Sequence, residues 1–317
     1  MTTLIVKVLR KVQEAQDIAS FELARADGGH LPAFSAGSHI DVHLPGLVRQ
    51  YSLCNHEGEQ HRYRIAVLRD PATRGGSVHM HDEVREGDLL QISEPRNHFP
   101  LAHAQRSVLL AGGIGITPLL CMAQRLAAIG ADFTLHYCTR SAARTAFRDE
   151  IAASTFADRV QFHFDDAGDA QKLQLAPALG QPSADTHVYV CGPTGFIDAM
   201  VAGAKAAGFA PEQIHLEYFG ATAQDTAGDR AFDVRIASTG QVVNVSAQQT
   251  VVQALAGAGI EILTSCEQGV CGTCITRVLE GHCDHRDLYF TDEEKAKHDQ
   301  FTPCCSRSTT PTLVLDL

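Results

Sequence analysis

Hydrophobic residues in the first hundred positions fall in short runs that are separated by Gly, Pro and polar residues. Such runs are typical of β-strands bounded by turns. The strands that they predict cover residues 4–9, 18–23, 39–44, 50–53, 63–68 and 89–92. Because short strands at this spacing are typical of a small antiparallel barrel, we expect a β-barrel domain over residues 1–103, with a short helix at 78–84.

Beyond residue 104, strand-like apolar runs alternate with Ala- and Leu-rich helical segments. Alternation of this kind implies a parallel sheet with helices on both faces. We therefore expect an α/β domain over residues 104–222. Its predicted strands are 107–111, 132–138, 160–164, 187–191 and 213–219, and its predicted helices are 119–129, 145–152 and 195–207.

The stretch ATAQDTAGDR that follows is made of small and polar residues without apolar periodicity, and it predicts a linker over residues 223–230. We expect residues 231–317 to form a third, compact α+β module. Its predicted elements are a hairpin at 231–237 and 241–245, a helix at 251–258 and a last strand at 312–315.

Composition and charge exclude several classes of protein. The chain has 317 residues, 44% hydrophobic and 20% charged, which is enough apolar surface to build folded cores. The 26 basic and 37 acidic residues give a net charge of −11, which argues against a nucleic-acid partner. There is no apolar run of membrane-spanning length, and Lys7, Arg10 and Lys11 interrupt the N-terminus before a signal-peptide core could form. We therefore expect a cytoplasmic protein without a membrane segment.

Six of the ten cysteines lie within forty residues of one another, at positions 266, 271, 274, 283, 304 and 305. Disulfides are rare in the cytoplasm, so a cysteine cluster there indicates metal or redox chemistry. Cys266-x4-Cys271-x2-Cys274 with a distant fourth cysteine is the plant-type 2Fe–2S spacing. Small residues in this loop, such as Gly269 and Gly272, allow backbone N–H groups to turn toward the sulfurs and tune the potential.

Two other metal sites fit the cysteines less well. A zinc site with four cysteines normally shows two C-x2-C pairs, and here only Cys271 and Cys274 are so spaced. A Rieske site needs two Cys/His pairs, and Cys283-x-His285 supplies only half of one. Spacing alone leaves open whether Cys304 or the adjacent cysteine is the fourth ligand.

A glycine-rich turn, AGGIGITP, stands between a predicted strand and a predicted helix. We expect Thr117 to cap this helix and Pro118 to occupy its first position, so that unpaired N–H groups face an anion such as a pyrophosphate. Pro118 stands where a Rossmann fingerprint has Gly or Ala, so the turn alone does not distinguish a dinucleotide site from an ordinary tight turn. A second strand–turn–helix segment, Cys191-Gly192-Pro193, makes a dinucleotide the favoured ligand.

The barrel carries a further candidate site. Arg49, Tyr51 and Ser52 lie on one predicted strand, and Arg74-Gly75-Gly76-Ser77 precedes the short helix. Each segment alone is typical of a surface strand or a turn. Together they supply a cation and a helix N-terminus for a phosphate, with an aromatic face and a hydroxyl for a planar ring, which are the groups that flavin mononucleotide requires.

The order of these motifs, RQYSL, RGGS, AGGIGITP, CGPTG and SCEQGVCGTC with a late cysteine, resembles the phthalate dioxygenase reductase family, which includes vanillate O-demethylase reductases. The resemblance extends over essentially the whole chain. It implies an FMN barrel, an NAD-binding α/β domain and a β-grasp 2Fe–2S ferredoxin domain. It also implies that Ser52 lies near the flavin N5 and Cys191 near the nicotinamide, both as catalytic residues, and that Cys304 is the fourth iron ligand.

The same resemblance implies the remaining ligand contacts. FMN is bound by Arg49, Tyr51, Ser52, Leu53, Gly75, Gly76 and Ser77, and NADH by Gly112, Gly113, Gly115, Thr117, Pro118, Gly192 and Pro193. Phe219 either packs on the flavin or is an ordinary core residue. Arg140 and Arg144 either meet the adenosine ribose, where they would keep NADPH open, or are surface charges. Spacing alone does not exclude FAD in place of FMN.

The implied function is that of a reductase component in aromatic catabolism. It would move electrons from NADH through FMN and the 2Fe–2S cluster to a Rieske non-haem iron oxygenase, such as a demethylase. A flavin is required because NADH gives two electrons together and the cluster accepts one at a time. The third module has six basic and eleven acidic residues, which favours a basic partner surface. The alternatives are a reductase for a haem or di-iron hydroxylase, or a 2Fe–2S redox sensor without turnover.

Overall fold

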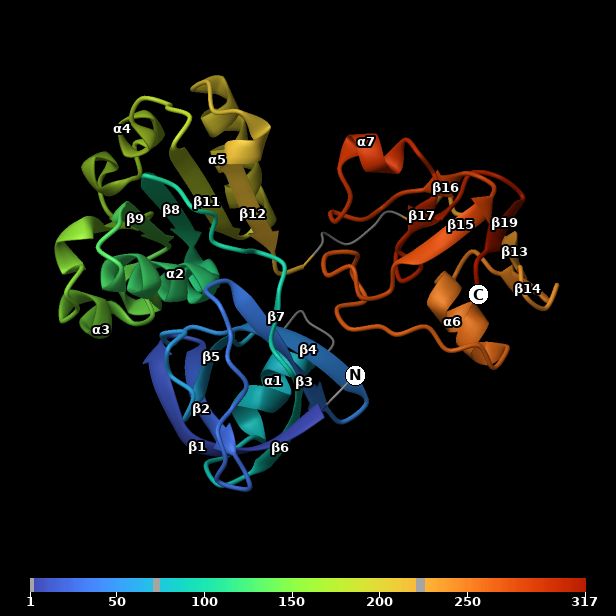
Figure 1. The fold of residues 1–317 in the computed structure, drawn as a ribbon, viewed down its shortest axis with the longest axis horizontal. Helices are drawn as coiled ribbons and strands as arrows, with labels where there is room; N and C mark the ends of the chain where they lie inside the picture. Colours follow the sequence, from blue (N-terminus) through green and yellow to red (C-terminus); the bar gives the residue numbers. More distant parts are fainter. Residues whose placement is uncertain (1–2, 71–74, 221–225) are drawn as a thin grey trace. The chain divides into compact units, whose positions relative to one another are not determined.

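The computed structural model describes residues 3–70, 75–220 and 226–317 and divides into two compact units, Met1–Glu217 and Tyr218–Leu317 (Figure 1). We describe each unit by itself. The division of the first unit at residue 103 and the linker at 223–230 remain predictions. Part of that linker, and Arg74 of the predicted phosphate loop, lie outside the described residues.

The N-terminal half of the first unit is an antiparallel sheet in the order β4-β3-β6-β1-β2-β5, with β7 paired to β3. A bridge between Leu53, just after β4, and Ile65 of β5 joins the two edges of this sheet and closes it. Apolar side chains from the strands fill the interior, together with Met80 of the short helix α1 (Gly76–Asp82). The strands are β1 (Thr3–Ala15), β2 (Ile18–Arg25), β3 (Ser38–Leu44), β4 (Leu47–Ser52), β5 (Tyr63–Leu68), β6 (Leu89–Ser93) and β7 (Arg96–Asn97).

The second half of this unit is a five-stranded sheet in the order β10-β9-β8-β11-β12, and the pairs β10–β9, β9–β8 and β8–β11 are parallel. The chain leaves β8 toward β9 on one side and later returns to β11 on the other. The carboxyl ends of β8 and β11 therefore form a topological switch point, where open α/β sheets bind ligands. The strands are β8 (Arg106–Gly112), β9 (Asp132–Thr139), β10 (Val160–Phe164), β11 (Thr186–Gly192) and β12 (Ile214–Tyr218).

The helices of this half are α2 (Ile116–Ala128), α3 (Arg148–Ala152), α4 (Leu175–Leu179) and α5 (Thr194–Ala206). The helix predicted over 145–152 is wrong in its first turn. Phe147 has a φ of +59°, and the Thr145 hydroxyl is bonded to that of Thr139 at 2.8 Å, so the chain is held in a loop until Arg148. Short-range tertiary contacts thus override the helical pattern here.

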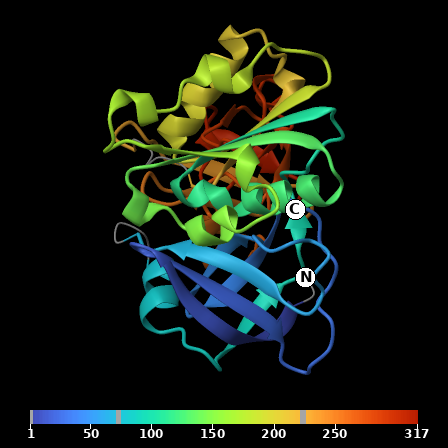
Figure 2. The ribbon, with the colours of Figure 1, turned by 90° about the vertical axis from the view of Figure 1, so that its left-hand side faces the viewer.

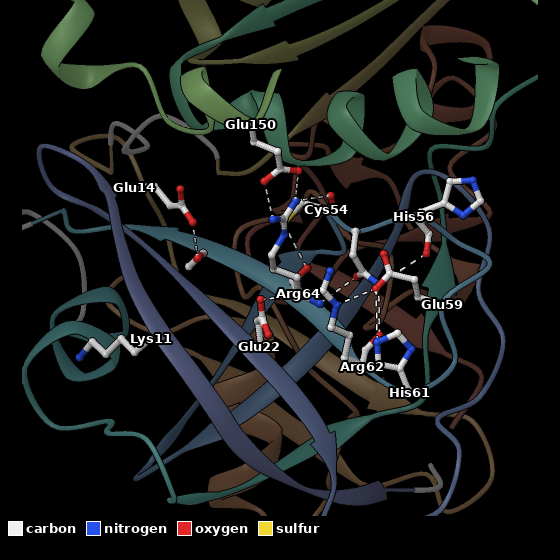
Figure 3. A network of polar contacts seen from close by, with 12 residues as sticks. Lys11, Glu14, Glu22, Cys54, His56, Glu59, His61, Arg62, Arg64 and Glu150 are labelled. Atoms are coloured by element: carbon white, nitrogen blue, oxygen red, sulfur yellow. Dashed lines mark hydrogen bonds and ion pairs between the residues drawn. The ribbon is translucent and has the colours of Figure 1, made fainter. Parts of the chain in front are cut away.

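The barrel and the α/β sheet of the first unit lie one above the other (Figure 2). An ion pair joins them, because Arg64 of β5 binds Glu150 of α3 through both carboxylate oxygens, at 2.6 and 2.7 Å (Figure 3). The Arg64 guanidinium also lies over the Phe147 ring, 4.9 Å from its centre. The Arg64 side chain is only 10% exposed and the Glu150 side chain is 40% exposed, so the guanidinium, unlike that of a surface pair, is largely removed from water.

We expect Glu150→Gln to lower the free energy of unfolding of the first unit by about 1–3 kcal/mol, because the buried guanidinium loses its charged partner. Chemical denaturation followed by flavin fluorescence measures the change. The matched control is Asp169→Asn, which breaks an exposed pair with Lys172 and should cost less than about 1 kcal/mol. Equal effects of the two variants would show that the bridge does not stabilise the contact between barrel and sheet.

The second unit is an α+β module built on a sheet in the order β14-β13-β19-β15-β17, with a separate β16–β18 pair. β13 pairs in parallel with β19 and antiparallel with β14, and α6 (Val251–Gly257) begins with a capping box made by Thr250 and Gln253. The remaining helix is α7 (Asp292–Lys295). The strands are β13 (Phe232–Ile236), β14 (Val242–Val245), β15 (Thr276–Glu280), β16 (Cys283–Asp284), β17 (Gln300–Phe301), β18 (Arg307–Ser308) and β19 (Thr312–Leu315).

The expected fold classes, an antiparallel β-barrel, a parallel α/β sheet and an α+β module, are confirmed by these three sheets. The sequence did not predict β15 to β18 or α7. Within residues 3–70, 75–220 and 226–317, no helix combines the length and the apolar character that crossing a membrane requires.

Candidate functional site

Two turns meet at the switch point of the α/β sheet. A Cβ placed on Gly115 would lie 2.2 Å from the carbonyl oxygen of Cys191, and one on Gly192 would lie 2.9 Å from the Cα of Gly112. The turn after β8 and the turn after β11 therefore touch backbone to backbone, which only glycine permits. By contrast, Gly113 has a φ of +53° and open space beside it. This glycine-lined surface at the end of two parallel strands fits a dinucleotide.

The start of α2 differs from the sequence prediction. A 3₁₀ turn, Gly113–Gly115, runs directly into α2, so the helix begins at Ile116 with Gly115 at its N-cap. The Thr117 hydroxyl donates to the carbonyl of Ile114 at 3.1 Å and does not cap the helix. Pro118 is the third helical residue, which is tolerated because the N–H groups of the first turn need no intrahelical partner. The predicted roles of these two residues at the helix start are therefore wrong.

Three groups that can carry protons lie together beside this switch point. Ser52, at the end of β4, is buried, and its hydroxyl donates to Oε2 of Glu217 at 3.4 Å. Cys191, at the end of β11, is fully buried, and Glu217 is close enough that its ionised form would raise the pKa of the thiol. The structure thus brings the two predicted catalytic residues to one acidic side chain on β12.

Burial determines the protonation of this trio. Loss of water around the carboxyl raises the pKa of Glu217 to about 8, and the hydrogen bond from Ser52 opposes this only in part. Burial also raises the pKa of the Cys191 thiol well above its ordinary value. At neutral pH the three groups are therefore a hydroxyl, a thiol and a neutral carboxyl. Glu217 was missed by sequence reasoning, although an acidic residue inside the predicted strand 213–219 marked it.

The predicted phosphate site of the barrel is built around Arg49 on β4. Its side chain lies across Gly76, where an added Cβ would be 2.7 Å from the Arg49 Cγ and would displace the Arg49 side chain. Gly75 has a φ of +98° and is the N-cap of α1. The Ser77 hydroxyl is bonded to the backbone of Asp70, at 3.1 and 3.3 Å, and closes the loop. Ser77 can therefore offer a phosphate its backbone N–H.

The other predicted flavin-binding residues differ in how far their side chains are buried. Tyr51 is half-buried, and burial raises the pKa of its phenol far above the ordinary value, against the opposing charge of Arg49. The side chain of Leu53 is fully buried in the barrel core, and its backbone N–H donates to the carbonyl of Ser38 at 2.8 Å.

Three further residues were candidates for contacts with the nucleotide or the flavin. Arg140 follows β9 and is exposed, whereas Arg144 is paired with Asp17 at 3.2 Å. Phe219 belongs to the second unit, and its 41% exposure excludes the ordinary core residue that was one alternative. Its packing on a flavin remains a prediction.

In the second unit the four predicted iron ligands come together. The Cys266 thiol is in hydrogen-bond contact with Cys271 and Cys304, and Cys274 is also in contact with Cys304. These contacts lower the pKa values of Cys266 and Cys274 and raise that of Cys304. Four convergent thiols, of which some favour the thiolate, are the donor set that a 2Fe–2S cluster requires.

The glycines of the cluster loop have left-handed backbone conformations. Gly269 and Gly272 have φ values of +72° and +69°. A Cβ on Gly269 would lie 2.4 Å from the sulfur of Cys305, and one on Gly272 would lie 2.4 Å from the Tyr289 ring. A larger residue at either position would adopt a strained backbone conformation and would have to displace one of these side chains.

The structure also separates the two adjacent cysteines. Cys304 is in contact with both Cys266 and Cys274, whereas the Cys305 thiol lies 3.3 Å from the Thr302 hydroxyl and contacts only Cys304 within the cluster set. The contact with Cys304 lowers the pKa of Cys305 to about 7. These contacts favour Cys304 as the fourth ligand.

A residue that sequence reasoning missed holds the segment of the fourth ligand in place. Arg307 is buried, and its guanidinium donates to the carbonyls of Gln249, Arg230 and Ser246 at 2.7, 3.0 and 3.0 Å. It also lies over the Phe232 ring, 5.2 Å from its centre. Arg307 thus ties the chain after Cys304 to the β13–β14 hairpin.

Known proteins share this architecture. A family model described as a 2Fe-2S iron-sulfur cluster binding domain matches residues 234–309, and one described as an oxidoreductase NAD-binding domain matches residues 109–202. The chain is 56% identical over 319 residues to the vanillate O-demethylase oxidoreductase of Pseudomonas sp. (strain HR199), with 100% of each chain covered.

Two solved structures are similar over almost the whole chain. One is phthalate dioxygenase reductase, described as a modular structure for electron transfer from pyridine nucleotides to 2Fe–2S. It is 38% identical with a TM-score of 0.78, and the match covers 99% of this chain and 98% of that one. The other is an intact type IV self-sufficient cytochrome P450 monooxygenase, 38% identical with a TM-score of 0.85, where the match covers 99% of this chain and 41% of that one.

Proposed function

The chain belongs to the phthalate dioxygenase reductase family, and from this premise we propose that it is the reductase component of a two-component Rieske oxygenase that demethylates an aromatic acid such as vanillate. It is an NADH-dependent iron–sulfur oxidoreductase whose cofactors are FMN, NADH and a 2Fe–2S cluster. The observation that carries the proposal is the convergence of four thiols in one unit with a glycine-lined dinucleotide surface in the other. Its use of NADH favours the cytoplasm as its compartment.

Each part of the chain has a separate task. FMN, when bound, supplies the conversion of an electron pair from NADH into single electrons. Arg49 and the N–H groups of Gly75 to Ser77 would hold the FMN phosphate, and the turns at Gly112–Gly115 and Gly192 would hold the NADH pyrophosphate. Ser52 and Cys191 would line the place where the nicotinamide meets the flavin ring, with Glu217 beside them.

The proposed iron ligands are Cys266, Cys271, Cys274 and Cys304, which hold the cluster at the acidic second unit. The oxygenase component is the proposed electron acceptor, and a complementary basic surface on it would speed the encounter. Reduction of a haem monooxygenase is the second candidate, because the same three-part architecture occurs within the cytochrome P450 monooxygenase described above.

The experiment that tests the proposal is a reconstituted assay. The purified holoprotein and NADH should support demethylation of vanillate by a vanillate oxygenase component, and should reduce cytochrome c without it. Failure with that oxygenase but turnover with a cytochrome P450 would favour the second candidate. Absence of any NADH-dependent reduction would favour a redox sensor and would contradict the proposal.

A prediction about pH follows from the neutral carboxyl of Glu217. Above pH 8 this group ionises and places a negative charge beside Cys191 and Ser52, so the rate of flavin reduction by NADH should fall by about tenfold per pH unit. Stopped-flow bleaching of the flavin under anaerobic conditions measures this rate. Glu217→Gln cannot ionise and should flatten the profile above pH 8, and an unchanged profile in that variant would exclude Glu217 as the titrating group.

The same group affects stability with a definite sign. Because its pKa is raised from 4.5 to about 8 on folding, the folded state binds the proton more tightly than the unfolded state does. Its contribution to stability is therefore complete below pH 4.5 and is lost as the pH rises to 8. Glu217→Gln should remove this decline from the thermal unfolding profile measured over that range.

A further inference from the structure

Three side chains of the second unit that are not among the proposed iron ligands form a separate group. They are Cys283 on β16, His285 just after it, and His298 in the segment between α7 and β17. Each offers one ligand atom, and the three atoms lie within 4.8 Å of one another. A thiol and two imidazoles at this separation match the donors that a borderline-soft divalent cation prefers.

His285 is prepared for a ligand role. Its side chain is only 6% exposed, and its Nδ1 lies 3.1 Å from a carboxylate oxygen of the fully buried Asp287. A carboxylate accepts a proton from Nδ1, so Nε2 carries the lone pair. Within the described part of the chain, this buried Nε2 has no hydrogen-bond partner. Metal-binding histidines are typically arranged in this way, with one ring nitrogen bonded to a carboxylate and the other bound to the metal.

Cys283 and His298 each have a ligand atom whose present hydrogen bond is a long one. The backbone N–H of Cys283 donates to Nδ1 of His298 at 3.2 Å, so this nitrogen carries a lone pair, and binding a cation there would replace the hydrogen bond from the amide. The Cys283 thiol is buried, and its hydrogen-bond contact is a long one, 3.9 Å to the carbonyl of His298. The rings of His285 and His298 are 5.9 Å apart, close enough for one ion to reach both.

We propose that Cys283, His285 and His298 bind one Zn²⁺-like cation, with water as the fourth ligand and with Asp287 as the positioning residue for His285. Ca²⁺ and Mg²⁺ do not fit, because they require oxygen donors. The metal would join β16 to the segment before β17. Without it, His298 is attached to this region through the hydrogen bond from the Cys283 amide and through the contact of its ring with that of His282.

Asp287 connects this site with the cluster loop. It accepts a hydrogen bond from the Ser306 hydroxyl at 3.4 Å, two residues after Cys304, and the N–H of Leu288 donates to the carbonyl of Gly269 at 3.0 Å. An ion on His285 therefore fixes a segment that touches both sides of the cluster binding site. Zinc should accordingly raise the unfolding temperature of the second unit, since the folded state brings the three ligands together and binds it more tightly than the unfolded chain does.

The test uses the holoprotein, freed of loosely bound metal with a mild chelator and titrated with Zn²⁺ alone by calorimetry. Metal analysis after gel filtration should give one zinc per chain in addition to two irons, with the visible spectrum of the cluster unchanged. His298→Ala and Cys283→Ser should each weaken zinc binding by at least about 100-fold, and Asp287→Asn by about 10–100-fold with the stoichiometry kept.

The matched control is Cys138→Ser, which removes a half-buried thiol from the first unit and should leave zinc binding unchanged. The iron content reports folding of the second unit in every variant, and His298→Ala, at a half-buried loop position, is the variant least able to disturb it. Absence of bound zinc in the wild type, or equal zinc binding in His298→Ala and the control, would overturn the proposal.

Discussion

Cys304→Ser should lose the native 2Fe–2S spectrum and reduce electron transfer from NADH to cytochrome c to background, while NADH still bleaches the flavin. The reason is geometric: Cys304 is in contact with both Cys266 and Cys274, so it closes the set of four thiols. A serine oxygen on a shorter bond is a poorer iron ligand than a thiolate. Stopped-flow reduction of the flavin measures electron transfer from NADH to the flavin. Absorbance and iron content report whether the cluster that accepts these electrons is present.

The adjacent cysteine supplies the control for this experiment. Cys305 lies against Thr302 and Gly269, outside the contacts that join the other thiols, so Cys305→Ser should retain the cluster and its turnover. A native cluster in Cys304→Ser together with its loss in Cys305→Ser would assign the fourth ligand to Cys305.

Gly115→Ala should destabilise the first unit by about 1–3 kcal/mol and weaken NADH binding, because its Cβ would lie 2.2 Å from the carbonyl oxygen of Cys191. The obstacle is backbone, which no rotamer can relieve, so the turn after β11 must move. Thermal unfolding and the NADH concentration dependence of flavin reduction measure the two effects.

A second glycine of the same unit provides the comparison. Gly168 has a φ of −60°, and an added Cβ would meet nothing within 4 Å, so Gly168→Ala should leave stability and NADH binding unchanged. Equal behaviour of the two alanine variants would mean that the close contact at Gly115 does not determine the geometry of the turn.

Sequence reasoning found what is encoded locally. Most strands of the barrel and of the α/β sheet were predicted within a few residues, because each is an apolar run between turn residues, as in β5 at Tyr63–Leu68. The exceptions are β1, which continues six residues beyond its predicted end, and β7, which was not predicted. The cysteine spacing was sufficient to predict that four thiols belong to one iron–sulfur site. The two-residue strands β16 to β18 have no such pattern, since their pairing depends on the chain around the cluster loop.

The features that were missed depend on tertiary surroundings. Glu217 becomes a neutral acid only because burial beside Ser52 and Cys191 raises its pKa. Cys283-x-His285 was considered in the sequence only as half of a Rieske site and was set aside, because His298 joins it from 13 residues further along the chain. The start of α2 was misplaced by two residues because a 3₁₀ turn of glycines precedes it.

The parallel pairing of β13 with β19 has a consequence for the order in which the second unit folds. Asp233 pairs with Thr312, 79 positions later, and β19 lies between β13 and β15 at the middle of the sheet. A contact between residues so distant in sequence forms slowly. The loop that carries Cys266 to Cys274 can therefore exist before Cys304 reaches it, and iron is captured in full only late in folding. Closure of the C-terminal strand, rather than formation of the ligand loop, would then limit assembly of the cluster.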